Sequence, residues 1–327
     1  MECPRRYPKS VHEQASGTAG AWSETPTRSS LGHHRGWLFL AKPALSTVVG
    51  ATPTSGTISR LGSSGLCLAV DDFGHATVTD LACPHRGVHL SLGHVDGEGA
   101  VVCAAHHTRF SRAGDVIGGP STAPLRRRPA HTSDLGYWVW PHSDPPTPIP
   151  DIAELNGRAV LAEGTRIGPY DWRDIGENAV DSAHISALHG TPTLPQVLDY
   201  TADYGAFRVT STITWTTGPN RTRDGHVQFE VFKPGVVVVR FSGIARLTSI
   251  VTWWPLQPNV AVVSWQVVMT DPNPRPVEIR LGEHLVGEVE TQLLDDLRIW
   301  EHKGPRGSVR LGPLDRHIAS YREWADR

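Results

Sequence analysis

The sequence has few cysteines and almost no excess charge. Only four of its 327 residues are cysteine (Cys3, Cys67, Cys83 and Cys103), too few for a disulfide scaffold in a chain of this length. The formal net charge of −2 offers no basic excess for nucleic acid or an anionic membrane surface. We therefore expect no disulfide framework and no nucleic-acid partner.

Long apolar segments are also missing. No run reaches the roughly 18 residues that a membrane-spanning helix needs. The opening residues, MECPRRYPKS, lack the apolar core of a signal peptide. We expect a cytoplasmic protein that does not act at a membrane.

Composition divides the chain into three parts. Residues 1–35 are rich in Ser, Thr, Gly, Pro and Arg, which predicts a mobile N-terminal arm. Short strand-like runs such as LCLAV and HATVTD, separated by Gly- and Asp-rich turns, predict a small all-β domain over residues 36–150. That domain ends in the proline-rich linker PHSDPPTPIP.

The remaining part, residues 151–327, mixes helices and strands. A helix-like stretch over 171–190 precedes long β-branched runs over 196–270, which are typical of an antiparallel sheet. A long amphipathic helix is predicted over 277–303. The fold class is therefore α+β, with an all-β N-terminal domain and a sheet flanked by helices.

Two cysteine–histidine pairs stand close together in the first domain. Cys83 and His85 form C-x-H, and after seventeen residues Cys103 and His106 form C-x-x-H. Four such ligands could bind one zinc ion. Structural zinc sites, however, usually group Cys with Cys and His with His. A Rieske-type two-iron cluster uses this mixed supply, because one iron takes both thiolates and the other both imidazoles.

Residues 83–114 resemble the cluster-binding loops of Rieske proteins. The likeness lies in CPHRG, in the second C-x-x-H, and in Phe110 and Gly114 beyond it. The resemblance implies that Cys83 and Cys103 hold one iron of a [2Fe-2S] cluster and that His85 and His106 hold the other.

The second loop departs from the family pattern. Family members usually have Tyr or Trp before the second histidine and Gly-Trp after it, whereas this chain has Ala105 before and His107 and Thr108 after. The cluster potential is therefore expected to be unusual. We expect His107, and also His89 and His94, to be surface or supporting residues rather than ligands.

A second histidine group occurs in ENAVDSAHISALHG, which contains Asn178, Asp181, His184 and His189. On one helix Asp181 and His184 share a face, while His189 lies about 140° from His184. A loosened final turn before Gly190 could bring His189 round to the same ion. The alternative is two unrelated histidines on a helix surface.

Two imidazoles and one carboxylate form the facial triad of non-haem iron(II) oxygenases. The C-terminal helix offers LLDDLRIW, in which Asp296 lies within about 40° of the apolar stripe and Asp295 points more than about 100° away. A carboxylate aimed inward needs a partner. An iron ion is one candidate, and a buried arginine is the alternative.

With both motifs, residues 36–303 resemble Rieske non-haem iron oxygenases. ENAVDSAH, together with IWEHK, whose Trp300 stands four residues past Asp296, is most similar to the branch of 3-ketosteroid 9α-hydroxylase and cholesterol 7-desaturase. The resemblance implies a helix-grip-like catalytic domain in which His184, His189 and Asp296 hold a mononuclear Fe(II). It also implies that Asp181 links this site to the cluster of a neighbouring subunit in a homotrimer, and that Asn178 lies near the iron.

The activity implied is that of a terminal oxygenase. Electrons from NAD(P)H would arrive through a separate flavin reductase or ferredoxin, and O2 would oxidise a C–H bond of a largely apolar, polycyclic or secondary-metabolite substrate by hydroxylation or desaturation. The alternatives are an electron carrier with a non-catalytic C-terminal domain and a zinc-stabilised binding protein. Five aromatic residues of the sheet could line the substrate pocket or pack in the core: Phe229, Phe232, Trp253, Trp254 and Trp265.

Overall fold

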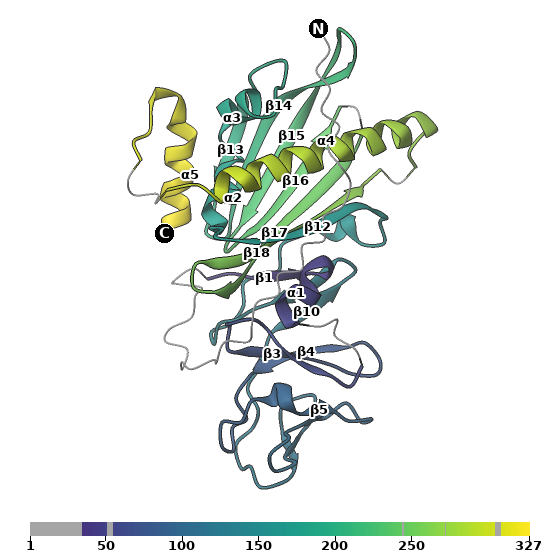
Figure 1. Ribbon diagram of the computed structural model, residues 1–327, viewed down its shortest axis with the longest axis vertical. Coiled ribbons are helices and arrows are strands. Elements are labelled where there is room, and N and C mark those ends of the chain that lie inside the picture. Colours follow the sequence, from purple (N-terminus) through teal and green to yellow (C-terminus); the bar gives the residue numbers. More distant parts are fainter. Residues whose placement is uncertain (1–34, 51–54, 244, 272, 305–308) are drawn as a thin grey trace.

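The computed structural model describes residues 35–50, 55–243, 245–271, 273–304 and 309–327. The arm predicted over residues 1–35 lies outside them except for Arg35. Small sheets make up the N-terminal half, and one large antiparallel sheet with a few helices makes up the rest (Figure 1). This confirms the predicted α+β class. The domain boundaries at residues 36, 150 and 151 stay a prediction.

The N-terminal half contains three small antiparallel sheets, in the orders β1-β11-β10, β2-β3-β4-β9 and β5-β6-β7-β8. Their strands are β1 (Leu38–Ala41), β2 (Ile58–Arg60), β3 (Leu66–Val70), β4 (Ala76–Asp80), β5 (His94–Val95), β6 (Val101–Val102), β7 (Arg109–Phe110), β8 (Val116–Gly118), β9 (Arg127–Arg128), β10 (Ala130–Ser133) and β11 (Gly136–Val139). A short helix, α1 (Leu45–Val49), follows β1. The apolar runs LCLAV and ATVTD form β3 and β4, as predicted.

The C-terminal half is built on a seven-stranded antiparallel sheet in the order β12-β18-β17-β16-β15-β14-β13. Its strands are β12 (Val160–Gly168), β13 (Val197–Ala202), β14 (Ala206–Gly218), β15 (Arg221–Phe232), β16 (Val236–Ser242), β17 (Leu247–Gln257) and β18 (Val260–Met269). Both faces of β16 are buried, because alternate valines enter two different clusters. Val237 and Val239 join the cluster that contains α4, whereas Val236 and Val238 pack with the first strands of the chain. This double burial explains an uninterrupted VVVV run.

The long helix α4 (Pro276–Trp300) crosses one face of this sheet (Figure 1). Its apolar stripe is buried as predicted and comprises Leu285, Val289, Leu293, Leu297 and Trp300. Among the described residues, no helix combines the length and apolarity needed to cross a bilayer.

The prediction of one helix-like stretch over 171–190 is wrong in one respect, because the structure divides it into α2 (Trp172–Glu177) and α3 (Ser182–Ala187). The break lies at Asp181, whose carboxylate caps α3 by accepting a hydrogen bond from the backbone N–H of His184 at 3.1 Å. Aspartate favours such a capping position over a helix interior. Asp181 therefore begins the second helix rather than lying inside one long helix.

Ion pairs to two buried carboxylates fix α2 to the C-terminal part of the chain. Lys303 Nζ lies 2.8 Å from Asp174 Oδ1 and 3.0 Å from Glu177 Oε1. Arg322 lies on the terminal helix α5 (Arg316–Asp326), and its Nε is 2.6 Å from Glu177 Oε2. These pairs hold the end of α2, and with it Asn178 and the start of α3, at a defined position beside α4.

Candidate metal centres

The two predicted cluster loops have closely matching backbone geometry. In the first, the N–H of Cys83 donates to Val88 O and the N–H of Gly87 to Cys83 O, both at 2.8 Å. In the second, the N–H of Cys103 donates to Thr108 O and the N–H of His107 to Cys103 O, both at 3.0 Å. Each loop thus closes on its own cysteine and presents that thiol and a nearby histidine together.

These loops bring the four predicted ligands to one place. Both thiols are free and buried, and the ring centroids of His85 and His106 lie 4.7 Å apart. Burial raises the pKa of the Cys83 thiol, as does the neighbouring Cys103 thiol, while the backbone N–H groups of His85 and Arg86 act in the opposite direction. A metal bound to these sulfurs would favour the thiolates that burial alone opposes.

The residues fit a cluster better than a single zinc ion. Among the described residues, the one group of three or more His, Cys, Asp or Glu side chains close enough to share an ion is elsewhere in the molecule. A tetrahedral zinc would draw the four ligand atoms to within about 4 Å of one another. His85 Nδ1 is buried without a hydrogen-bond partner among the described residues, as expected of an atom that binds a metal.

That one group is His184, His189 and Asp296, whose ligand atoms all lie within 4.8 Å of one another. Asp296 Oδ1 is 3.1 Å from His189 Nε2 and 3.7 Å from His184 Nε2. The buried-arginine alternative for Asp296 finds no support here, since its ion-pair partners among the described residues are the two imidazoles. His189 lies beyond the end of α3, which allows it to turn inward as predicted.

The backbone sets the protonation of His184. Its Nδ1 lies 2.5 Å from the carbonyl oxygen of Asp181, so Nδ1 carries the proton and Nε2 is left bare toward Asp296. Metal-binding histidines commonly have such a partner for the second nitrogen. Burial lowers the pKa of His184, although Asp296 and Asp181 oppose the shift. A neutral imidazole is the form that binds a metal.

A cavity of about 100 Å³ opens beside these three residues, between α3, α4 and the sheet. Apolar side chains line most of it, and adjacent strands supply them in rows: Phe229 pairs with Val239, which pairs in turn with Ser249, and Val227 pairs with Phe241. Asn178 also lines the cavity, next to the predicted metal ligands. The site can therefore present a C–H bond to a metal while apolar walls exclude water.

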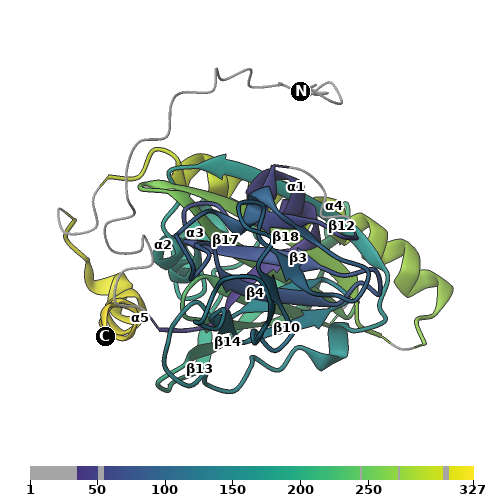
Figure 2. The same cartoon turned by 90° about the horizontal axis from the view of Figure 1, so that it is seen from below.

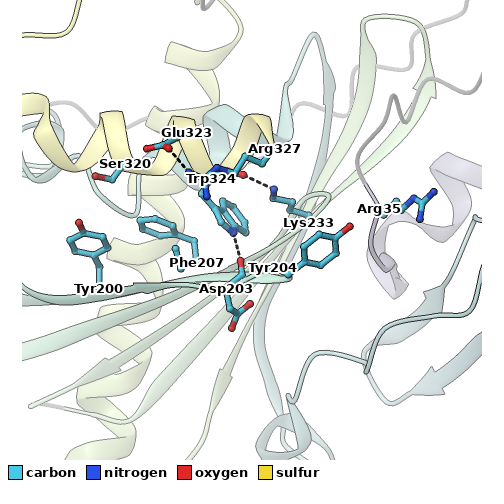
Figure 3. Close-up of a pocket in the computed structure, with 11 residues that line it drawn as sticks. Arg35, Tyr200, Asp203, Tyr204, Phe207, Lys233, Ser320, Glu323, Trp324 and Arg327 are labelled. Atoms are coloured by element: carbon cyan, nitrogen blue, oxygen red, sulfur yellow. Dashed lines mark hydrogen bonds and ion pairs between the residues drawn. The ribbon is translucent and has the colours of Figure 1, made fainter.

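A larger pocket of about 490 Å³ lies away from this centre, under α5 (Figure 3). Lys233 is buried there, donates a hydrogen bond to the carbonyl of Trp324, and lies 4.5 Å from the Trp324 ring. Trp324 Nε1 in turn donates to Asp203 O at 2.6 Å. These contacts attach α5 to the sheet, and the pocket contains no group of metal-binding side chains among the described residues.

Comparison with known families agrees with these two centres. Residues 49–129 match the Rieske [2Fe-2S] domain, and residues 137–327 match the 3-ketosteroid 9alpha-hydroxylase C-terminal domain. The chain belongs to the Rieske oxygenases. The second match covers more than half of this oxygenase chain, which favours the oxygenase prediction over the electron carrier.

Individual relatives are distant. The chain is 25% identical to the 3-ketosteroid-9-alpha-monooxygenase oxygenase component of Mycobacterium tuberculosis, over 80% of this chain and 74% of that protein. It is 25% identical to cholesterol 7-desaturase nvd 1 of Ciona intestinalis (77% and 60%) and 29% identical to the phthalate 4,5-dioxygenase oxygenase subunit of Pseudomonas putida (42% and 34%). The matched segment thus spans about a third to three fifths of the last two proteins.

Solved structures share the fold. Dicamba monooxygenase bound to 3,6-dichlorosalicylic acid aligns with a TM-score of 0.68 over 89% of this chain and 96% of that one, at 16% identity. NdmB of Pseudomonas putida CBB5 aligns with a TM-score of 0.66, at 17% identity. These matches show that the chain shares its overall fold with those proteins.

The sequence singled out only part of the cavity wall. Of the five aromatic residues considered, Phe229 alone lines the cavity, while Phe232, Trp253, Trp254 and Trp265 pack in the core. The missed wall residues include Ile213, Phe241, Val251 and Gln292. The strand members among them occupy odd-numbered positions, so strand alternation together with the known register would have found them.

Proposed function

We propose that the chain is the terminal oxygenase component of a Rieske system and oxidises a C–H bond of a largely apolar substrate by hydroxylation or desaturation. The observation that carries the proposal is the convergence of His184, His189 and Asp296 at an apolar cavity. An iron(II) ion held by these residues would supply dioxygen activation, since the triad leaves coordination positions open.

The chain's own residues prepare that chemistry. The Asp181 carbonyl oxygen accepts a hydrogen bond from Nδ1–H of His184, which turns Nε2 toward Asp296. Ile185, Val227 and Phe229 exclude water from the space where the C–H bond would lie. Asn178 stands at the same wall with a side-chain amide that could orient a bound molecule.

In this proposal Cys83, His85, Cys103 and His106 hold a [2Fe-2S] cluster that receives electrons from NAD(P)H through a separate reductase or ferredoxin. Within one chain the β5 end lies at the bottom of Figure 1, whereas α3 and α4 lie in its upper half. Electron delivery from the cluster of one subunit to the iron site of another subunit in a homotrimer therefore suits this arrangement better than electron delivery within one chain. Asp181, whose side chain is 30% exposed, would connect the two centres.

Metal analysis and a visible spectrum of the purified protein test the proposal. An oxygenase should contain about three iron atoms per chain, two in the cluster and one in the triad. Turnover with a surrogate reductase would be followed by mass, as the gain of one oxygen atom or the loss of two hydrogens. About two irons without turnover would favour the electron carrier, and zinc in a colourless protein would favour the binding protein. The cytoplasmic location stays a prediction.

A further inference from the structure

A second cavity, of about 500 Å³, lies on the outer side of the proposed iron site. His189 and Gln292 line both this outer groove and the inner cavity of about 100 Å³. The two spaces therefore meet at one metal-binding residue and one amide. A molecule bound in the outer groove could reach the metal-binding residues past the side chain of Gln292.

The inner cavity limits what can enter. A cavity of about 150 Å³ is known to bind benzene, so a space of about 100 Å³ is smaller than a benzene site. A fused-ring skeleton could enter only by an edge, whereas a short alkyl group fits whole. Apart from the metal-binding residues, its polar side chains are the uncharged Asn178, Ser249 and Gln292.

The outer groove has a different character. Its wall includes the hydroxyls of Thr191, Thr214 and Thr216 and the carboxylates of Glu288 and Asp295, and no Lys or Arg is among its described lining residues. His284 Nε2 lies 3.4 Å from Glu288 Oε1. Asp295 is half-buried, and among the described residues it has no ion-pair partner. A partly desolvated carboxylate without a partner favours a cation or a hydrogen-bond donor.

We propose that the substrate is an amphipathic molecule that places a small alkyl group in the inner cavity and a protonated amine or hydroxyl-rich portion in the outer groove beside Asp295. The inference rests on the proposed function, because it assumes that C–H oxidation occurs at the triad. It predicts that carboxylates and phosphates bind poorly, since the groove offers them no cation.

Equilibrium binding to the iron-loaded protein, without turnover, tests the charge preference. Calorimetric titration with butylammonium, butanol and butyrate should rank the ammonium first and the carboxylate last. Asp295→Asn should weaken butylammonium binding about fivefold, the upper range for an ion pair that solvent still reaches, and leave butanol unchanged. Glu283→Gln, which changes an exposed carboxylate on the same helix outside the groove, should alter none of the three affinities.

A second titration tests the size limit. Butylammonium should bind better than benzylammonium to the unmodified protein, and Phe229→Ala, which enlarges the inner cavity from a half-buried wall position, should reverse that order. Tighter binding of butyrate than of butylammonium, an unchanged affinity in Asp295→Asn, or no binding of any probe would overturn the inference. None of these results affects the iron content or the cluster spectrum, so failure here is distinct from failure of the proposed function.

Discussion

The two proposed metal centres are built by different means. The cluster loops, residues 83–88 and 103–108, repeat the same pair of backbone hydrogen bonds, so each loop positions its ligands by itself. The triad has no such repeat. His184 comes from α3, His189 from the chain just beyond it and Asp296 from α4, more than a hundred residues later. Local backbone geometry defines the first centre and tertiary packing the second.

This difference determines how damage spreads from each centre. A change in one cluster loop removes a ligand but leaves the other loop closed, since their backbone bonds are separate. A change that shifts α4 against α3 would separate the triad even with every ligand present. The two centres should therefore be lost independently when ligands are replaced, and the following predictions test that independence.

The largest effect is expected from Cys103→Ala. Removing one thiolate should abolish the cluster, reduce iron from about three to about one atom per chain, and stop electron delivery. Cys83→Ala should match it, because the two loops are equivalent. Cys67→Ala changes a buried cysteine outside the loops and should retain the visible spectrum. Cluster retention in Cys103→Ala would contradict the assignment.

Asp296→Ala is the corresponding test at the triad. It should keep the cluster spectrum but lose the mononuclear iron and all turnover, because two imidazoles alone hold iron(II) weakly. Asp295→Ala, at the adjacent position, should retain about three irons per chain. Iron analysis and spectroscopy of both variants make the measurement. Full iron content in Asp296→Ala would remove this residue from the ligand set.

The contrast also explains what could be predicted from the sequence. The spacing of Cys83, His85, Cys103 and His106 was informative because their ligand geometry is local. Helical periodicity was enough to place Asp296, rather than Asp295, beside the two histidines, since α4 is one regular helix. It failed over 171–190, where Asp181 caps a new helix instead of continuing one.

Substitutions at Asp181 separate its proposed role in electron delivery from its role as the cap of α3. Asp181→Asn keeps a side-chain oxygen that can cap α3 but removes the charge, so the protein should retain about three irons while turnover falls about tenfold or more. Asp181→Ala should show the same slowing and also lose about 1 kcal/mol of stability with the cap. Single-turnover kinetics with a pre-reduced cluster would locate the defect. Unchanged rates in Asp181→Asn would exclude this carboxylate from the electron path.

The smallest effects concern one of the positions at which the two loops differ. Gly87 and His107 occupy equivalent places, with φ of 75° and 52°, in the left-handed region that glycine adopts freely and most other residues do not. A Cβ at residue 87 would meet nothing within 4 Å, so Gly87→Ala should cost only the backbone strain, about 1 kcal/mol. His107→Gly should relieve similar strain but increase the entropy of the unfolded chain, for a net gain below about 1 kcal/mol.

Thermal unfolding of Gly87→Ala and His107→Gly, compared with the unmodified protein, would measure these two changes in stability. A lower unfolding temperature in Gly87→Ala and a higher one in His107→Gly would show that both loops require a residue with positive φ at this position. The second loop meets this requirement with a histidine, at a small cost in stability. If His107→Gly instead lowered the unfolding temperature, the exposed imidazole would have to stabilise its loop through contacts that outweigh the strain. The departure from the family's Gly-Trp pattern would then be a stabilising feature of this chain.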